Sequence, residues 1–296
     1  MEEAAQNNFG TQGEKMTSDI WHSNRLPKLF PNLYQALKTI LEKHGIGYRE
    51  IPGTRDIWCR DYMPVCAADG GMIQFVYRPS YLRKVKEDRH RFTPPSCWDG
   101  LTFASRVRES VLFLDGGTVE TCGRTGIVTE RLFKDNFPFD HEDLTIRFRQ
   151  LLALDRLIVI PEEPGDVTGH VDGVVRFVDE RRVVMNDYAL EKELAGYGRK
   201  VETILREEGL ENLKLPYAPT GEIGADGMPS ALGCYINFLR IGDLVILPQF
   251  GLKQDAEALA ACRRIFGGDI EVETVECSKL ASEGGVLNCV SWTDTV

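Results

Sequence analysis

Residues 169–177 read Gly169-His170-Val171-Asp172-Gly173-Val174-Val175-Arg176-Phe177. The β-branched residues of this segment predict a strand, in which residues i and i+2 point to the same face. We therefore expect His170 and Asp172 to lie side by side, with Arg176 on the same face as an ion-pair partner. A lone His-x-Asp pair more often lies on a solvated strand face than in a catalytic site, so its meaning depends on the rest of the chain.

The segment is part of a pattern that recurs about every 55–60 residues, a spacing typical of propellers and repeat arrays. Each copy contains a hairpin, a helix and a further strand, recognised by apolar periodicity and glycine-rich turns. The expected hairpins cover residues 58–77, 111–129, 169–186 and 235–248. The expected helices cover 33–41, 190–208 and 255–266, and the further strands cover 48–51 and 157–160. Strands over 271–275 and 286–292 are expected to begin a fifth copy. The pattern predicts five such units around one axis, with an ordinary mixed α/β sheet as the alternative.

Polar residues recur at similar points of the copies. They are Trp58, Asp61, Asp115, His170, Asp172, Tyr235, Asn237 and Cys289. If the copies surround a common axis, these side chains converge in one concave site, which is the usual form of an active site.

This set of residues suits chemistry on a guanidinium group. Cys289 becomes a strong nucleophile when it loses its proton, a state that a nearby imidazolium or a cationic substrate stabilises. His170 can give a proton to a leaving group and later take one from water. Asp61 and Asp172 match the paired N–H donors of a guanidinium, and Asp115 can orient the imidazole through its other nitrogen.

The composition is that of a globular protein. The chain has 296 residues, of which 43% are hydrophobic and 27% charged, and no apolar run reaches the roughly 18 residues that cross a bilayer. The net charge of −10 argues against a nucleic-acid partner and weakly favours a cationic substrate. Residues 1–19 are polar and lack the apolar core of a secretion signal. We therefore expect a mobile tail over 1–19, one catalytic domain over 20–296 and a cytoplasmic location.

Metal and nucleotide motifs do not occur in the sequence. The eight cysteines and five histidines are scattered, without a Cys-x-x-Cys or His-Glu-x-x-His pattern or a phosphate-binding loop. We therefore expect no metal and no cofactor, and we expect the cysteines other than Cys289 to be reduced core residues. The basic stretch from Arg78 to Arg91 lacks a clear periodicity, and we expect a solvated loop there, or alternatively a lid or a carboxylate-binding patch.

Six segments carry a family resemblance. They are Trp58-Cys59-Arg60-Asp61-Tyr62-Met63-Pro64, Leu114-Asp115-Gly116-Gly117, Gly169-His170-Val171-Asp172, Tyr235-Ile236-Asn237-Phe238, Pro248-Gln249-Phe250-Gly251, and Gly284-Gly285 through Cys289. In this order they resemble the motifs of agmatine deiminases and bacterial peptidylarginine deiminases. The resemblance extends over residues 48–292 and implies the pentein fold, a five-fold pseudo-symmetric α/β propeller.

The resemblance also implies an activity. Cys289 would be the nucleophile, His170 the general acid and base, Asp61 and Asp172 the guanidinium clamps, and Asp115 the support of the imidazole. Trp58, Asn237 and Arg176 are expected to complete the substrate site. The implied reaction is the deimination of an agmatine-like guanidine to a ureido product and ammonia through an amidino-cysteine intermediate, as in putrescine biosynthesis. Peptidylarginine deimination, amidino transfer and guanidinium binding without turnover remain alternatives, and a homo-oligomer is left open.

Several positions differ from the family pattern. Asp115 stands where the family has Glu, Asn288 where it commonly has His, Gly173 where it commonly has Asn, and Arg55-Asp56 near its Asp-Asp. The N-terminal Trp-Glu-x-His-like segment has no clear counterpart before Leu33. The sequence thus keeps the reacting residues and alters positions that shape the substrate pocket.

Overall fold

The computed structural model describes residues 19–79, 92–103, 105–224 and 227–294, and in them the strands form five three-stranded sheets. In spatial order the sheets are β15 (Trp292–Thr293), β1 (Ile20–Ser23) and β2 (Tyr48–Ile51); β3 (Val65–Cys66), β4 (Met72–Val76) and β5 (Val107–Phe113); β6 (Val119–Cys122), β7 (Thr125–Thr129) and β8 (Arg156–Ile160); β9 (Val175–Phe177), β10 (Arg182–Asp187) and β11 (Glu211–Pro216); β12 (Leu239–Ile241), β13 (Leu244–Gln249) and β14 (Glu271–Glu276).

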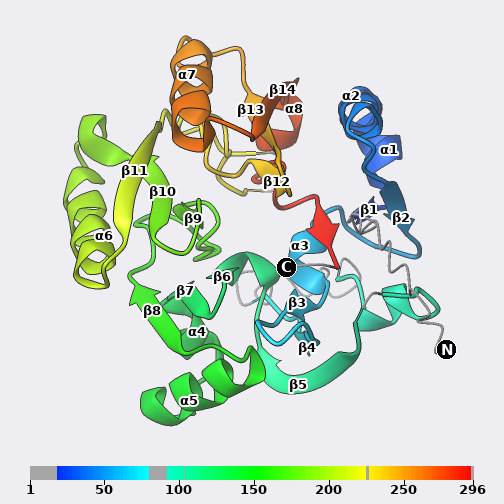
Figure 1. Cartoon of the computed structure of the whole chain (residues 1–296), viewed down its shortest axis with the longest axis vertical. Helices are drawn as coiled ribbons and strands as arrows, with labels where there is room; N and C mark the ends of the chain where they lie inside the picture. The colour runs from blue at the N-terminus through cyan, green and yellow to red at the C-terminus, as the bar shows by residue number, and fades with distance from the viewer. Residues whose placement is uncertain (1–18, 80–91, 104, 225–226, 295–296) are drawn as a thin grey trace, which may run out of the picture.

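Every sheet repeats one topology. The first strand pairs antiparallel with the middle strand, and the middle strand pairs parallel with the third. The helices are α1 (Leu26–Leu29), α2 (Pro31–Lys43), α3 (Cys59–Tyr62), α4 (Arg131–Asp135), α5 (His141–Leu151), α6 (Ala195–Glu207), α7 (Asp255–Phe266) and α8 (Ser278–Ala281), with 3₁₀ turns η3 (Pro95–Trp98), η4 (Gly116–Thr118) and η5 (Tyr188–Leu190). Figure 1 shows the sheets around a common centre, with α2, α5, α6 and α7 on the outside. The predicted ring of hairpin–helix–strand units is therefore confirmed.

The middle strands hold the ring together. They are buried along most of their length because the outer helices and the neighbouring sheets cover both of their faces. A typical contact joins Val201 and Leu205 of α6 to Val183 of β10 in one buried cluster. Within the part of the chain described, no helix combines the length and the hydropathy needed to cross a bilayer.

The ring is closed by segments from opposite ends of the chain. β15 pairs antiparallel with β1, so that Trp21 lies opposite Trp292 and Ile20 opposite Thr293. The prediction of a strand over residues 286–292 that opens a separate fifth copy is therefore wrong, because residues 287–290 form a turn and β15 completes the sheet of β1. Residues 1–18 of the predicted tail lie outside the described residues.

The segment 169–177 also differs from its prediction. Only Val175–Phe177 is a strand, and residues 171–174 form a turn in which the amides of Val174 and Val175 both donate to the carbonyl of Val171, at 2.9 Å. A similar turn precedes the first strand of every sheet, as α3 precedes β3 and η4 precedes β6. The polar side chains therefore lie on turns at the inner ends of the hairpins and not on strand faces.

Several element bounds agree with the sequence prediction. The strand over 48–51 and the helix over 255–266 have the predicted limits, whereas the helix expected from residue 190 begins at Ala195. The sequence analysis missed α5, which Asp140 caps by accepting from the amides of Glu142 and Asp143. Most of the basic stretch, residues 80–91, lies outside the described residues, so its role stays a prediction.

Candidate active site at the centre of the ring

A cavity of about 370 Å³ lies where the turns of several hairpins meet. The side chains of His170, Asp172, Asn237 and Cys289 line it. His170 and Asp172 come from the turn before β9, Asn237 from the turn before β12 and Cys289 from the turn before β15. The structure thus brings together residues that are far apart in the sequence, as the repeat predicts.

Asn237 holds the turn that carries Cys289. Its side-chain oxygen accepts hydrogen bonds from the amides of Asn288, at 3.1 Å, and Cys289, at 3.4 Å, and lies 3.3 Å from the Cys289 sulfur. Its side-chain nitrogen donates to the main-chain oxygen of Asp172 at 3.4 Å. These bonds are all made to the protein itself, so Asn237 fixes the position of the thiol.

His170 lies between two buried carboxylates. Nδ1 lies 3.8 Å from Oδ1 of Asp61, and Nε2 lies 3.5 Å from Oδ2 of Asp115. Burial lowers the pKa of His170, but the charges of Asp61, Asp115 and Asp172 outweigh it and raise the pKa to about 10. Burial raises the pKa of Asp61 to about 7, against the opposing charge of His170. The imidazole is therefore a cation at neutral pH, held by its carboxylate neighbours.

Gly117 connects the turn of His170 to that of Asp61. Its amide donates to Oδ1 of Asp61 at 3.1 Å, and its carbonyl accepts from the amides of Val171, at 2.9 Å, and Asp172, at 3.2 Å. A Cβ atom at this position would lie 2.6 Å from Nδ1 of His170. A residue without a side chain is therefore needed here for the imidazole to approach the backbone.

Asp172 faces the thiol. Its Oδ2 accepts from the side-chain nitrogen of Asn288 at 2.7 Å and lies 3.9 Å from the Cys289 sulfur. Burial, followed by the charges of Asp172 and Asp61, raises the pKa of the Cys289 thiol well above its usual range. The thiol is therefore protonated when no cation occupies the cavity.

Three predicted substrate residues are not among the described residues that line this cavity: Arg176, Trp58 and Asp61, the last of which lies against His170. Arg176 forms an ion pair with Glu120 and donates to the carbonyl of Phe238 at 2.9 Å. Arg176 pairs with neither of the predicted guanidinium clamps, Asp61 and Asp172. The strand β9 begins only at Val175, so the side chains from His170 to Arg176 do not alternate between two strand faces as expected. Trp58 packs behind Gly285, whose added Cβ would lie 2.5 Å from the indole ring, and is not among the described residues that line this cavity.

The cavity has an acidic wall that the sequence analysis missed. Glu163, Asp166 and Glu222 line it, and the described lining contains no lysine or arginine. Glu163 accepts from the hydroxyl groups of Tyr188 and of Tyr217, the latter at 2.9 Å, and burial raises its pKa to about 7. Glu163 lies three residues after the end of β8, and a carboxylate just beyond the end of a strand could have indicated a site residue.

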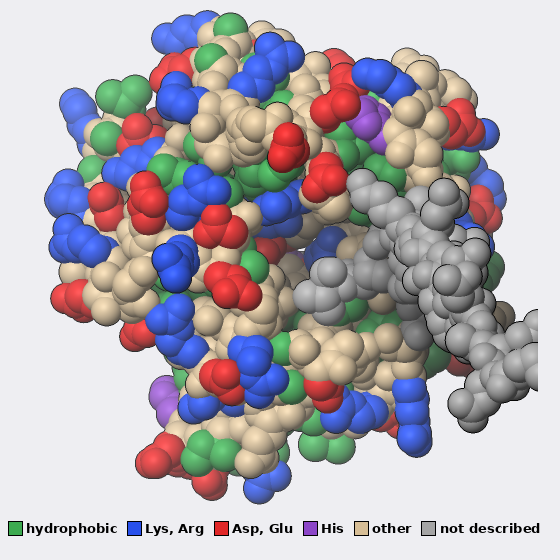
Figure 2. Space-filling model, in the orientation of Figure 1, with side chains coloured by type: hydrophobic (Ala, Val, Ile, Leu, Met, Phe, Trp, Pro, Cys, Tyr) green, Lys and Arg blue, Asp and Glu red, His purple; other side chains and the backbone are tan. Residues whose placement is uncertain are grey.

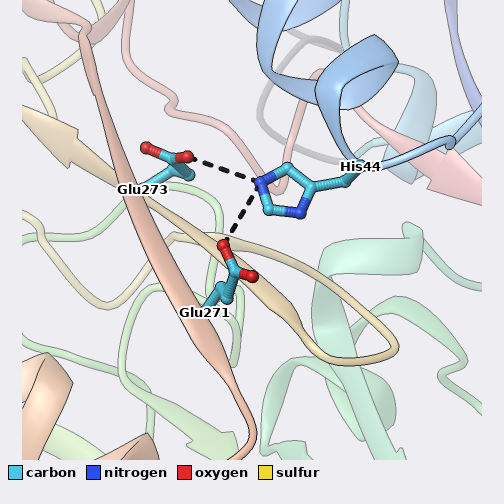
Figure 3. A group of neighbouring side chains, drawn as sticks. All are labelled: His44, Glu271 and Glu273. Carbon is cyan, nitrogen blue, oxygen red and sulfur yellow. Dashed lines mark hydrogen bonds and ion pairs between the residues drawn. The ribbon is translucent and has the colours of Figure 1, made fainter.

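One group of side chains has the spacing of metal ligands within the described part of the chain. Figure 3 shows His44 at the end of α2 directed toward Glu271 and Glu273 of β14, with Nε2 at 3.8 Å and 3.4 Å from their carboxylates. Lys43 also binds Glu273, so a cation of the protein already satisfies this carboxylate. The cluster is accounted for by ion pairs between α2 and β14, and the predicted absence of a metal stays a prediction.

Comparison with known proteins identifies relatives of this chain. The model of the Porphyromonas-type peptidyl-arginine deiminase family matches residues 28–294. An agmatine deiminase of Stutzerimonas stutzeri is 25% identical over 219 residues, which cover 64% of this chain and 59% of the relative. One from Pseudomonas putida is 26% identical over 214 residues, which cover 63% of this chain and 58% of the relative. The matched segment thus spans less than two thirds of these relatives' own length.

Solved structures show the same fold. The agmatine deiminase of Enterococcus faecalis superposes with a TM-score of 0.75 at 17% identity, over 94% of this chain and 93% of that chain. DDAH from Pseudomonas aeruginosa superposes with a TM-score of 0.59 at 12% identity, over 94% and 99%. The predicted class, a five-fold pseudo-symmetric α/β propeller of the pentein type, is confirmed. Within that class, the chain belongs to the Porphyromonas-type peptidyl-arginine deiminase family.

Proposed function

We propose that this protein is a cysteine-dependent hydrolase that converts agmatine to its ureido product and ammonia. The observation that carries the proposal is that Cys289, His170 and Asp172 line one cavity, with the carboxylates of Asp61 and Asp115 buried against the imidazole. A guanidinium carbon is a poor electrophile, so the group must be fixed beside a nucleophile and an acid.

The reaction begins with binding of the guanidinium beside Asp61 and Asp172. Its positive charge opposes the effect of these carboxylates on the thiol and favours the thiolate of Cys289, whose proton passes to solvent because His170 is already protonated. The sulfur attacks the guanidinium carbon, the C–N bond breaks, and the departing nitrogen takes a proton from His170 to leave as ammonia. Water then attacks the amidino-thioether carbon and His170 takes one of its protons. The C–S bond breaks as the proton of the new hydroxyl passes to the sulfur, which releases the ureido product and restores the thiol.

The acidic wall supports agmatine as the substrate. Agmatine carries an ammonium at the end opposite its guanidinium, and Glu163, Asp166 and Glu222 provide negative charge for it. Free arginine would bring an α-carboxylate into a cavity whose described lining has no lysine or arginine to meet it. The acidic composition of the chain also supports a small cation as the substrate. A cytoplasmic location stays a prediction.

The family match supports a second candidate, peptidylarginine deimination. A substrate panel separates the two, with agmatine, arginine and a blocked arginyl peptide, and with ammonia and ureido groups as readouts. We expect the highest kcat/KM for agmatine and the lowest for arginine. If the blocked peptide reacts faster than agmatine, the second candidate is correct and our proposal is wrong. If no substrate releases ammonia, the protein is an amidinotransferase or only binds the guanidinium.

The role of the thiol has a matched control in the same cavity. Cys289→Ser should abolish turnover, because a hydroxyl is a far poorer nucleophile without a matched base. Cys234 also lines the cavity, and its thiol lies 3.7 Å from the carbonyl of Gly173. Cys234→Ser should retain ammonia release, and equal loss in both variants would contradict the covalent mechanism.

A further inference from the structure

A second cavity, of about 180 Å³, lies on the axis of the ring. Its lining comes from the first strand of every sheet, or from the turn before that strand. Figure 1 shows β3, β6, β9, β12 and β15 gathered around the middle of the molecule. Figure 2 shows a hollow in the middle of this face, with basic side chains near it.

The axial cavity is positively charged, although the chain as a whole carries a net charge of −10. Three arginines line it, Arg60, Arg176 and Arg240, together with one described carboxylate, that of Glu120. Counting these four side chains gives a local charge of +2. Each arginine comes from a different sheet unit, so the fold itself directs the guanidinium groups to the axis.

Two of these arginines lack a carboxylate partner in the described part of the chain. Arg176 forms its ion pair with Glu120. Arg60 donates from Nε to the carbonyl of Asn288 at 3.4 Å, and Arg240 donates to the carbonyl of Val178 at 2.6 Å. Each planar guanidinium has five N–H donors, so these contacts leave donors available for a further acceptor.

The guanidinium groups are also held rigidly. Arg176 stacks on the ring of Phe238 at 4.9 Å, and Arg240 stacks on the ring of Phe266 at 5.2 Å. Burial, followed by the charge of Arg176, lowers the pKa of Arg240, so the like charges oppose each other. An anion bound between them would offset this repulsion.

We propose that the axial cavity binds a small oxyanion through the guanidinium groups of Arg60, Arg176 and Arg240. Guanidinium forks match the paired oxygens of phosphate and carboxylate groups, so both are candidate ligands. The site is distinct from the substrate cavity, which is acidic. It lies against Asn288, whereas the adjacent Cys289 lines the substrate cavity. The amide of Arg60 donates to the carbonyl of Cys289 at 3.2 Å, so the two cavities share one segment of backbone.

The test is a calorimetric titration of the full chain with inorganic phosphate and, separately, with malonate, at an ionic strength held constant with chloride. Arg240→Gln removes one cation, and Arg240→Lys retains it. Glu120→Gln removes the competing carboxylate. Arg206→Gln, on the exposed side of α6, is the charge-matched control. Thermal unfolding shows which variants fold. If Arg240→Gln does not fold, the affinities of Glu120→Gln and Arg240→Lys for the two oxyanions still test the proposal.

We expect one oxyanion per chain in the wild type and in the Arg206→Gln control. Binding should be about tenfold weaker in Arg240→Gln, since one charge-assisted hydrogen bond is lost, and only partly restored in Arg240→Lys, which keeps the charge but not the guanidinium fork. It should be tighter in Glu120→Gln, because the local charge rises. A preference for phosphate or for malonate identifies the ligand group. Equal affinity in Arg240→Gln and Arg206→Gln, or no binding of either oxyanion by the wild type and Glu120→Gln, would overturn the proposal.

Discussion

Replacement of Gly117 by alanine should displace the imidazole of His170. The added Cβ would lie 2.6 Å from Nδ1, 3.0 Å from Cγ and 3.1 Å from Oδ1 of Asp61. Ordinary van der Waals contact begins at 3.4 Å, so the ring must move by 0.8 Å, which is the difference between the two distances. Gly117 is not among the residues with positive φ, so alanine strains the backbone little and the effect is confined to the contact.

A misplacement of about 1 Å in a reacting group can cost roughly 100-fold in rate, or about 2.7 kcal/mol in activation free energy. We expect a loss of this order in kcat for agmatine, with KM changed less. Gly196→Ala is the control, because the same methyl group, on α6 and not among the described residues that line the cavity, meets only the guanidinium of Arg199, at 4.0 Å. Ammonia release and thermal unfolding should be measured for both variants. A folded Gly117→Ala enzyme with wild-type kcat would refute the assigned role of His170.

The remaining predictions concern the thiol, a clamp, an acid and metals. A cationic haloacetamidine should label Cys289 faster than neutral iodoacetamide, because a bound cation lowers the raised pKa of the thiol, and mass spectrometry of the digest would identify the site; equal rates would contradict this. Asp172→Asn should lower kcat/KM for agmatine about tenfold or more, since one charge-assisted contact is worth about 1.5–3 kcal/mol, and an unchanged value would place the guanidinium elsewhere. Glu163 has a folded pKa raised to about 7, so its stabilising contribution is present at low pH and is lost as pH rises from its unfolded value through 7. Glu163→Gln should therefore gain stability relative to wild type between pH 5 and pH 8, by at most about 3 kcal/mol in denaturant unfolding, whereas a pH-independent difference would refute the shift. Dialysis against a chelator, and His44→Ala, should both leave activity unchanged, and a metal whose removal stopped turnover would contradict the assigned site.

The sequence predicted the repeat because its signals are local. The buried middle strands are apolar runs bounded by glycine turns, as in Leu244–Gln249, and α7 has a regular apolar stripe that ends at Gly267. The convergence of the polar residues followed from the repeat alone. The close approach of Cys289 and His170 to buried carboxylates was therefore predictable before any coordinate was known.

The rest could not be predicted because it depends on contacts between copies. A Val-Val run does not show whether the residues before it belong to the strand or form a turn. Here the amides of Val171 and Asp172 both donate to the carbonyl of Gly117, which holds them in a turn. The partner of Arg176 is set by the packing of β9 beside β6, which places Glu120 within reach. α5 buries few apolar residues, among them Leu144 and Phe148, so its periodicity is weak and its capping residue Asp140 is the clearer signal.

The pairing of β15 with β1 has a consequence for the order of events during synthesis. The sheet of β1 and β2 keeps one edge unpaired until Trp292 and Thr293 have left the ribosome, since among the described strands it is β15 that pairs with that edge. Cys289 lies three residues before β15 and is positioned by the turn that leads into it. The nascent chain therefore positions the thiol that we propose as the nucleophile in the same step that seals the propeller.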